Sequence, residues 1–351
     1  MKINLCRASG MLAAMFLATA LAVAGEYGRS VLVLTSTNNA SGNDVVVFKL
    51  DTAGTPSLSL VGMLPTGGNG GASTNAGILQ FQHDLGAVAN YGSNTVSPLM
   101  RNGNSINIGG AIKLATGCVK PDSVALNEGH LLVVGTTCAE SHAWPSGYVD
   151  GTVNLTDPSA AQIAAGQDWA AVTLTSGSVL QLQLSPWGAL SGASSTVTLP
   201  SNANSVPLGA AFWGDILGFT PAHSPDSFAI MDRNRNVFPV AGPTPPYPSN
   251  APCWVAKGPG SVWYTGNSPG TAISIFFSDG QGGVFYKSVP LPGSPTDITV
   301  SSDNQWLAVI YTVGSEGYVG VFSIDQYGDL TPVAMSNSIG VAAFSGVAFS
   351  Q

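Results

Sequence analysis

The chain has 351 residues, of which 44% are hydrophobic and only 9% are charged, and its formal net charge is -8. High hydrophobicity with little charge excludes an intrinsically disordered chain, which needs the reverse balance. The negative charge and the eleven scattered Lys and Arg residues exclude a protein that binds a phosphate backbone, so we expect no nucleic-acid partner.

The first segment, residues 1–24, has the features of a secretory signal peptide. Lys2 and Arg7 precede an apolar run from Met11 to Val23, and the run ends in an Ala-Val-Ala sequence of the kind that signal peptidase cleaves. No later apolar run reaches the ~18 residues that a membrane span needs. We therefore expect a mature chain of residues 25–351 without a membrane span, secreted to the periplasm or the extracellular medium.

A repeated unit fills the mature chain. The segments Pro158–Trp169 and Pro295–Trp306 both lead from Pro to Trp in the same number of steps, and each continues through an apolar strand, a Gly/Ser loop and an alternating strand to a turn. Repeats of about forty residues with four strands each are typical of a β-propeller. The units are expected to begin near Asn75, Pro121, Pro158, Pro207, Pro252, Pro295 and Ala342.

The turn between the third and fourth strands gives a second marker of the repeat. It is expected at Gly54, Gly103, Gly151, Gly188, Arg235, Gly282 and Gly328, which makes seven turns for seven starts. Asn-Gly and Asp-Gly, found at Gly103 and Gly151, suit a two-residue hairpin because both of its central positions need positive φ. Strand alternation is clear in Val179–Leu184, while strands 45–50 and 318–324 are apolar on nearly both faces, as in sheets stacked between neighbours.

The two ends of the chain complete one unit. The sequence begins its mature part on a second strand without a first, and it ends near residues 343–350 on a first strand without the rest. Pairing of these ends removes the open edge of a partial ring. The sequence therefore predicts one all-β domain, a seven-bladed β-propeller with four-stranded antiparallel blades, closed by pairing of the C-terminal strand with the N-terminal blade.

Two segments resemble a known family. Residues 87–96, AVANYGSNTV, are similar to the YVTN-type propeller repeat, and together with residues 321–330, VFSIDQYGDL, they resemble the seven-bladed lactonase-like propellers. The resemblance covers essentially the whole mature chain, but blade-building residues carry it, so it bears on fold more than on activity. It implies phosphosugar lactonase or muconate-lactonising activity, with sites that use Arg together with His and Glu.

The arginines of this chain depart from that pattern. The mature part has only Arg29, Arg101, Arg233 and Arg235, and the last three map to turns at the far end of the blades from the usual pocket. Without a positioned bidentate donor, an anionic substrate is not favoured. We expect a small, neutral or weakly polar molecule, or a glycan, instead.

The third blade holds the principal candidate site. Its loop between second and third strands, taken as residues 136–147, carries Glu140, His142 and Trp144. In a propeller such loops gather at one face with the blade-to-blade connections. We predict His142 as a general base, Glu140 as the group that orients it, and Trp144 as an apolar wall. The alternative is a surface loop held by a disulfide, without a ligand.

The fifth blade adds a second His and carboxylate on the same face. His223 is the predicted acid or polarising group, and Asp226 either lines the pocket or caps its own turn. Four more polar residues are expected to line the pocket from loops of that face: Tyr91, Asn94, Asn267 and Glu316. His83 and His130 map to the opposite end of the blades and are expected to be structural.

The sequence gives no reason to expect a cofactor. Pocket-side Asn and Asp leave room for a divalent cation such as calcium, but no spaced ligand motif supports one, so no metal ligands are assigned.

Cys118 and Cys138 are placed symmetrically about the hairpin turn of the third blade, so a disulfide between them is geometrically natural in an oxidising compartment. Cys253 is then unpaired. A bridge from either of the first two to Cys253 stays open at this point.

Two functions fit these observations. The first is a secreted lactonase-like enzyme that hydrolyses or isomerises a small molecule, with Glu140, His142 and His223 as catalytic residues. The second is a non-catalytic propeller, most simply a monomer, that binds a small molecule, glycan or protein through the same face. Family resemblance favours the first and the scarcity of converging ionisable residues favours the second.

Overall fold

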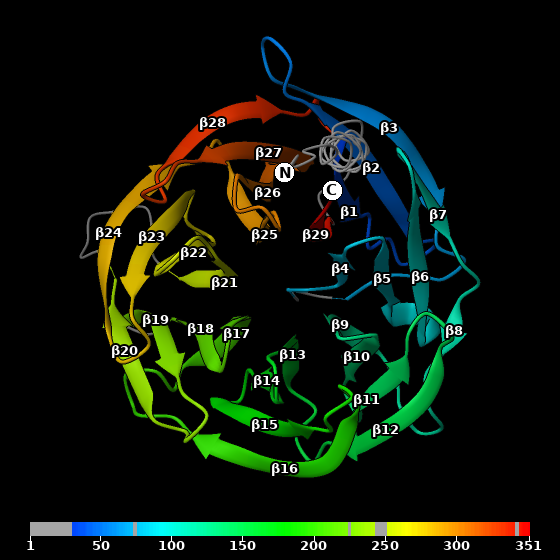
Figure 1. The fold of residues 1–351 in the computed structure, drawn as a ribbon, viewed down its shortest axis with the longest axis vertical. Coiled ribbons are helices and arrows are strands. Elements are labelled where there is room, and N and C mark those ends of the chain that lie inside the picture. The colour runs from blue at the N-terminus through cyan, green and yellow to red at the C-terminus, as the bar shows by residue number, and fades with distance from the viewer. Residues whose placement is uncertain (1–29, 73–75, 224–225, 243–250, 341–343) are drawn as a thin grey trace, which may run out of the picture.

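The computed structural model describes residues 30–72, 76–223, 226–242, 251–340 and 344–351. These residues form seven antiparallel sheets arranged as a closed ring around a central axis (Figure 1). The chain is a seven-bladed β-propeller, and the predicted fold class is confirmed. The predicted signal peptide, residues 1–24, lies outside the described residues, as do Asn75 and Ala342 among the expected blade starts.

Each blade is described from the channel outward. Blade 1 contains β29 (Ser345–Ser350), β1 (Val31–Ser36), β2 (Asp44–Asp51) and β3 (Ser57–Pro65). Blade 2 contains β4 (Leu79–Gln82), β5 (Leu85–Asn90), β6 (Thr95–Asn102) and β7 (Ser105–Ile108), with the short β8 (Ile112–Lys113) also paired to β6 and a 3-10 turn η1 (Tyr91–Ser93). Blade 3 contains β9 (Pro121–Asn127), β10 (His130–Gly135), β11 (Cys138–Ala143) and β12 (Tyr148–Asn154).

The other four blades follow the same order. Blade 4 contains β13 (Ala160–Ala165), β14 (Trp169–Leu174), β15 (Ser178–Leu184) and β16 (Leu190–Thr198). Blade 5 contains β17 (Val206–Trp213), β18 (Ile216–Ala222), β19 (Asp226–Met231) and β20 (Val237–Ala241). Blade 6 contains β21 (Pro252–Lys257), β22 (Val262–Asn267), β23 (Ala272–Ser278) and β24 (Gly283–Pro290), and blade 7 contains β25 (Ser294–Val300), β26 (Trp306–Val313), β27 (Glu316–Ile324) and β28 (Leu330–Met335).

Closure of the ring is confirmed. The strand β29 pairs antiparallel with β1, so that Val33 lies opposite Phe349 and Leu34 opposite Ala348. The first and last segments of the chain therefore share blade 1 (Figure 1). Because β29 covers the inner edge of β1, blade 1 has four strands like the other blades, and the ring is closed.

The core lies between the blades. Inner strands such as β1 and β14 are buried on both faces because each sheet is stacked between two others. Six separate apolar clusters fill the spaces between neighbouring sheets. The outermost strands are half exposed, and β3 shows this in its alternating pattern of exposed and partly buried residues. Most apolar side chains therefore pack between blades, and the channel is bordered by the backbone edges of the innermost strands.

One predicted turn is wrong. Six of the seven expected third-to-fourth-strand turns lie where predicted, but Gly151 lies inside β12 and is paired with Ser141. The actual turn of blade 3 spans residues 144–147, between β11 and β12. The error arises because the polar segment after residue 136 resembles a loop, whereas most of it forms β11.

Among the described residues, no helix has the length and apolar character that a bilayer crossing requires.

Candidate functional site

A cavity of about 230 Å³ lies along the axis of the ring. Consecutive residues of the inner strands line it, including 162–165 of β13 and 297–300 of β25. Consecutive residues can all reach the cavity because each inner strand presents its backbone edge to the channel, while its side chains point mainly toward neighbouring blades. The wall therefore offers backbone N–H and C=O groups as well as a few polar side chains.

Gly77, just before β4, lines this cavity and contacts the neighbouring strands β9 and β25. The Gly77 carbonyl accepts hydrogen bonds from the backbone N–H of Val124 (2.8 Å) and the hydroxyl of Ser123 (3.3 Å), and the Gly77 N–H faces Asp297 of blade 7 (3.4 Å). Ala76 packs in the apolar cluster that includes Trp254 of blade 6. Ala76 and Gly77 thus join blade 2 to blades 3, 6 and 7.

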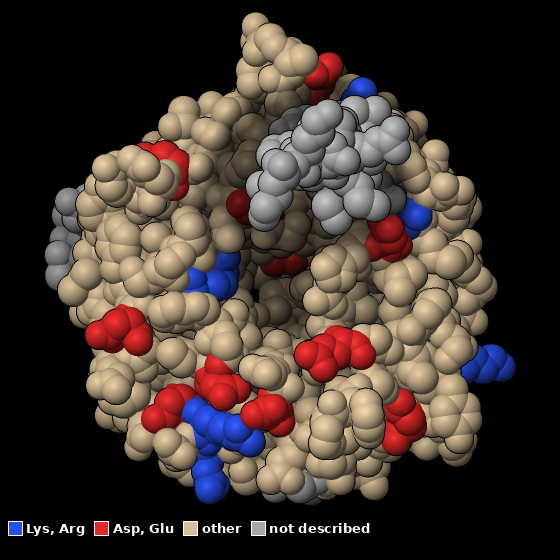
Figure 2. Space-filling view, in the orientation of Figure 1, with Lys and Arg blue, Asp and Glu red and all other residues tan. Residues whose placement is uncertain are grey.

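Glycine is required at position 77. Its φ is +69°, and a Cβ there would lie 2.8 Å from the Ser123 hydroxyl and 3.1 Å from the Gln162 side-chain nitrogen. The cavity extends from Gly77 to the ends of the inner strands, where Lys257 and Val300 line it. The face shown in Figure 2 is hollowed at its middle, where the channel opens.

Asp297 is the buried carboxyl group of the cavity wall. It lies in β25 just after a β-bulge, and only 5% of its surface is exposed. One carboxyl oxygen accepts the backbone N–H of Ile298 (2.8 Å), and the other faces the N–H groups of Gly77 (3.4 Å) and Val347 (3.3 Å). Burial raises the pKa of Asp297 to about 7, against the opposing effect of these three N–H groups. At neutral pH this carboxyl group is present in both protonated and ionised forms.

Lys257 lies at the other end of the cavity. Its ammonium group donates to the carbonyls of Gly258 and Gly260 (2.6 Å each) and lies 4.7 Å from the centre of the Trp213 ring. Burial lowers the pKa of Lys257 to about 8. The single cationic group on the wall is therefore already held by protein acceptors and by an aromatic face.

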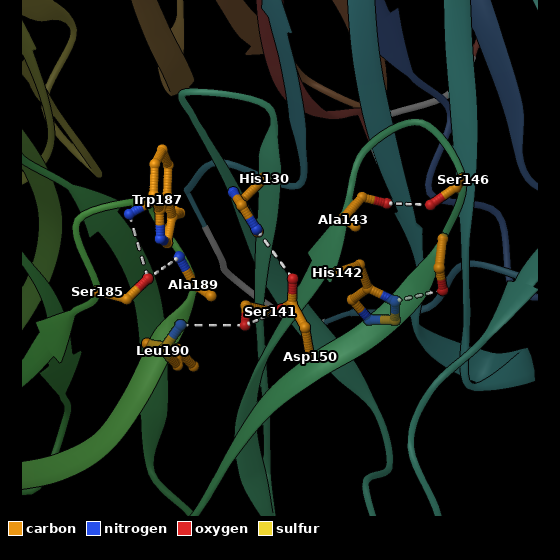
Figure 3. Close-up of polar contacts among 11 residues, drawn as sticks. His130, Ser141, His142, Ala143, Ser146, Asp150, Ser185, Trp187, Ala189 and Leu190 are labelled. Carbon is orange, nitrogen blue, oxygen red and sulfur yellow. Dashed lines mark hydrogen bonds and ion pairs between the residues drawn. The ribbon is translucent and has the colours of Figure 1, made fainter.

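Glu140 and His142 are brought together, but not on the predicted loop. Both are in β11, fully buried, with His142 Nε2 2.6 Å from a Glu140 oxygen. Figure 3 shows the other ring nitrogen of His142 directed to the Gly147 carbonyl, at 3.0 Å. The second Glu140 oxygen accepts the N–H of Ala115 (2.9 Å). The predicted placement of Glu140 and His142 on a loop at the pocket face is wrong. A carboxylate and an imidazole on the same face of a strand neutralise each other, so both side chains can be buried within β11.

The pKa of His142 reflects this enclosure. Burial lowers it, but the hydrogen bonds to Glu140 and to the Gly147 carbonyl, together with the charges of Glu140 and Asp150, outweigh burial and raise the pKa above its usual value. Trp144 is also misplaced by the prediction. It follows β11 in the turn at the opposite end of blade 3 and packs in the cluster between blades 2 and 3.

A polar cluster close to this pair joins blades 3 and 4 (Figure 3). His130 contacts one oxygen of Asp150 (2.9 Å), and the Ser141 hydroxyl donates to the other (2.6 Å) while it accepts the N–H of Leu190 (3.0 Å). The three side chains do not form a Ser-His-Asp triad, because the carboxylate lies between Ser141 and His130 and the imidazole does not contact the hydroxyl. His130 begins β10, at the end of the blade where the sequence placed it, and its structural role stays a prediction.

The remaining predicted residues lie on the predicted face but do not line the cavity. The side-chain oxygen of Asn94 accepts the backbone N–H of Lys120 (2.7 Å), and the Lys120 ammonium group lies 5.7 Å from the centre of the Tyr91 ring. Asn94 and Tyr91 therefore connect blade 2 to the segment that leads into blade 3. Asn267 is buried against Thr265 and Ser274. Glu316 accepts the Tyr318 hydroxyl (2.8 Å).

In blade 5, His223 is exposed at the end of β18 with a φ of 64°, and Asp226 begins β19. The catalytic roles predicted for Glu140, His142 and His223, and the lining role of Asp226, stay predictions.

The predicted disulfide between Cys118 and Cys138 is confirmed, with Cα atoms 5.4 Å apart, and Cys253 is a buried free thiol. Within the described ranges, one group of three ligand-type side chains is close enough to hold a metal: the two bridged sulfurs and Glu140. Because the sulfurs are bonded to each other, this group is not a thiolate metal site.

Sequence reasoning missed Asp297. Asp297 lies two positions after the proline that opens blade 7, and Asp122 lies one position after the proline that opens blade 3. An acidic residue within two positions of the proline at the start of an inner strand was a usable signal, because the inner strands border the channel.

No family model and no curated protein matches the sequence. Solved structures match in fold. A protein from Lactobacillus plantarum superposes with a TM-score of 0.69 at 14% identity over 92% of this chain and all of that one. A protein from Bacteroides fragilis provisionally classed as a 6-phosphogluconolactonase gives a TM-score of 0.66 at 12% identity, covering 93% of this chain and 99% of that one. Virginiamycin B lyase from Staphylococcus aureus gives 0.58 at 14% identity, covering 80% and 94%. At these identities the likeness shows the fold alone.

Proposed function

We propose that the protein is an exported propeller that binds a small, neutral or weakly polar molecule in its central cavity. The observation that carries this proposal is Asp297, a buried carboxyl group in the wall of the central cavity. With a pKa of about 7, its side chain can donate or accept a hydrogen bond at neutral pH. Buried polar groups in concave sites are the usual means of orienting small ligands.

The size and charge of the cavity limit the ligand. Its volume of about 230 Å³ is below the ~300–1,000 Å³ typical of drug-sized ligands, so a single ring with few substituents is the expected size. Lys257 is held by two carbonyls, which leaves an anionic ligand without a free cationic partner on the wall. A compact uncharged molecule with a carbonyl or hydroxyl group fits these conditions.

Lactone hydrolysis is a second candidate function, and the raised pKa of Asp297 favours it. As carboxylate, Asp297 would take a proton from a water molecule while the water oxygen forms a bond to the lactone carbonyl carbon. The ring C–O bond would then break, and the leaving alkoxide would take the proton back from Asp297. Similar folds provisionally classed as 6-phosphogluconolactonases support this candidate by analogy alone.

The proposal is tested with the purified mature protein and a panel of small lactones, each matched with its open-chain hydroxy acid and a cyclic ether of the same size. Binding is read by calorimetry, and lactone opening by proton release. We expect the neutral ring compounds to bind and Asp297→Asn to weaken binding at least ten-fold. Asp303→Asn, the same change in the first turn of the same blade, should leave binding unchanged.

Each outcome decides one part of the proposal. Binding without proton release supports a binding protein and removes the hydrolase candidate. Proton release that is lost in Asp297→Asn supports hydrolysis. If the panel does not bind, or if the two Asp variants behave alike while both remain folded by circular dichroism, the assignment of the ligand site to the cavity is overturned.

A further inference from the structure

A second cavity lies between blades 4 and 5, away from the channel. It has a volume of about 570 Å³. Gln181, Gln183 and Ser195 of blade 4 form one wall, and the turn between β19 and β20, which carries Arg233, Asn234 and Arg235, forms the other. None of these residues lines the central cavity.

The register of blade 4 explains why this wall is polar. Trp169 lies opposite Gln183, and Gln181 opposite Ser195, so the side chains of these pairs share the face that is turned to blade 5. Deeper on the same face, Val179 and Val197 pack in the apolar cluster between blades 4 and 5. The alternation Val-Leu-Gln-Leu-Gln-Leu in β15 thus changes from apolar to amide side chains where the two blades separate.

The two arginines of the opposite wall differ in their partners. Arg233 forms an ion pair with Asp168 of blade 4 (2.7 Å), and its carbonyl accepts the Gln181 amide (3.2 Å), which fixes the turn against blade 4. Arg235 is exposed and has no side-chain partner among the described residues. Its φ is +72°, a conformation that non-glycine residues seldom adopt. The second cavity therefore holds the guanidinium group of Arg235, which has no ion-pair partner among the described residues, in a protein whose net charge is -8.

We infer that the second cavity binds a sugar acid, that is, a carboxylate with several hydroxyl groups. Its carboxylate would pair with Arg235, and its hydroxyl groups would bond to the side-chain amides of Gln181, Gln183 and Asn234. A guanidinium binds a carboxylate with two parallel hydrogen bonds, and primary amides offer both donors and acceptors to hydroxyl groups. The volume lies within the range of pockets that hold small organic ligands. Such a ligand can be a free sugar acid or a uronate unit of a polysaccharide.

Calorimetric titration of the mature protein with galacturonate, trigalacturonate and galactose tests this inference. We expect both acids to bind and galactose, which lacks the carboxylate, to bind at least ten-fold more weakly. Tighter binding of the trimer indicates a polysaccharide source, and equal binding a free sugar acid. Binding of neither acid, or equal binding of galactose, overturns the inference.

Variants localise the binding. Arg235→Ala should weaken binding of the acid at least ten-fold, and Arg235→Lys should recover only part of it because the paired hydrogen bonds are lost. Gln181→Ala should weaken binding less. Lys49→Ala removes the same charge from an exposed position on blade 1 and should have no effect. If Lys49→Ala weakens binding as much as Arg235→Ala, the attraction is general electrostatics and the site is wrong.

Discussion

At the scale of single residues, Glu140 and His142 show how a polar sequence can occupy the inside of a sheet. Both are fully buried two positions apart on β11 and bonded at 2.6 Å, and a backbone N–H and a backbone carbonyl satisfy their remaining atoms. A buried charge that is paired and hydrogen-bonded can be tolerated, whereas the same charge without its partner is costly.

The change His142→Ala is therefore expected to destabilise the fold by about 3–5 kcal/mol, because it leaves Glu140 buried without its partner. Urea unfolding measures this. The matched change His130→Ala breaks a more exposed pair with Asp150 and should cost about 1 kcal/mol or less. Since the pKa of His142 is raised in the folded state, its contribution is present below its usual pKa of 6.5 and is lost as pH rises through the raised value. Similar losses in both variants would contradict the enclosed ion pair.

Asp297 gives a dependence on pH of the same sign, in a window that begins at lower pH. Its pKa rises from 3.8 to about 7, so between these values the folded state keeps a proton that the unfolded state has released. Stability therefore falls as pH rises through this window, by at most ~1.4 kcal/mol per pH unit for one group. Asn cannot titrate, so Asp297→Asn should lack this slope. Unfolding at pH 4.5, 6 and 7.5 measures the difference, and parallel curves for the two proteins would show that the carboxyl group does not titrate there.

At the scale of elements, blade 3 is held by more than strand pairing. The disulfide from Cys118 to Cys138 spans 20 residues and fixes the start of β11 to the segment before β9. This anchoring explains why β11 begins directly after residue 137, where the sequence alone favoured a longer loop.

Removal of this disulfide in the double variant Cys118→Ser, Cys138→Ser should destabilise the protein by about 3 kcal/mol on the chain-entropy argument for a loop of this length. The free energy of unfolding in urea, with and without reductant, measures it. Cys253→Ala removes a buried sulfur without opening a loop and should cost less. Reductant should lower the stability of the natural chain and leave the double variant unchanged; an equal response of both would contradict the bridge.

At the scale of the whole molecule, stability depends on the joining of the two chain ends in blade 1. Without β29, the strand β1 would present an open apolar edge to the channel, and the apolar cluster between blades 7 and 1 would lose Val347 and Phe349.

A chain that ends at residue 340 is therefore expected to lose its cooperative unfolding transition and to aggregate. Thermal melting and size-exclusion chromatography measure this. A synthetic peptide of residues 344–351 should restore at least part of the transition, because it can pair with β1. A truncated chain that melts like the full one would show that ring closure does not require β29.

The sequence alone determined the number of blades, their strand order and the closure, and it favoured the disulfide between Cys118 and Cys138 without excluding Cys253 as a partner. These follow from local patterns that recur with each repeat, such as Pro at the start of inner strands, glycine in turns and strands apolar on both faces. The site could not be read in this way, because Asp297, Gly77 and Lys257 come together only when blades far apart in sequence converge on one axis. Likewise, only the tertiary structure placed Glu140 and His142 inside blade 3. Their polar sequence by itself predicts a loop, but the two side chains pair with each other and so can be buried in a strand.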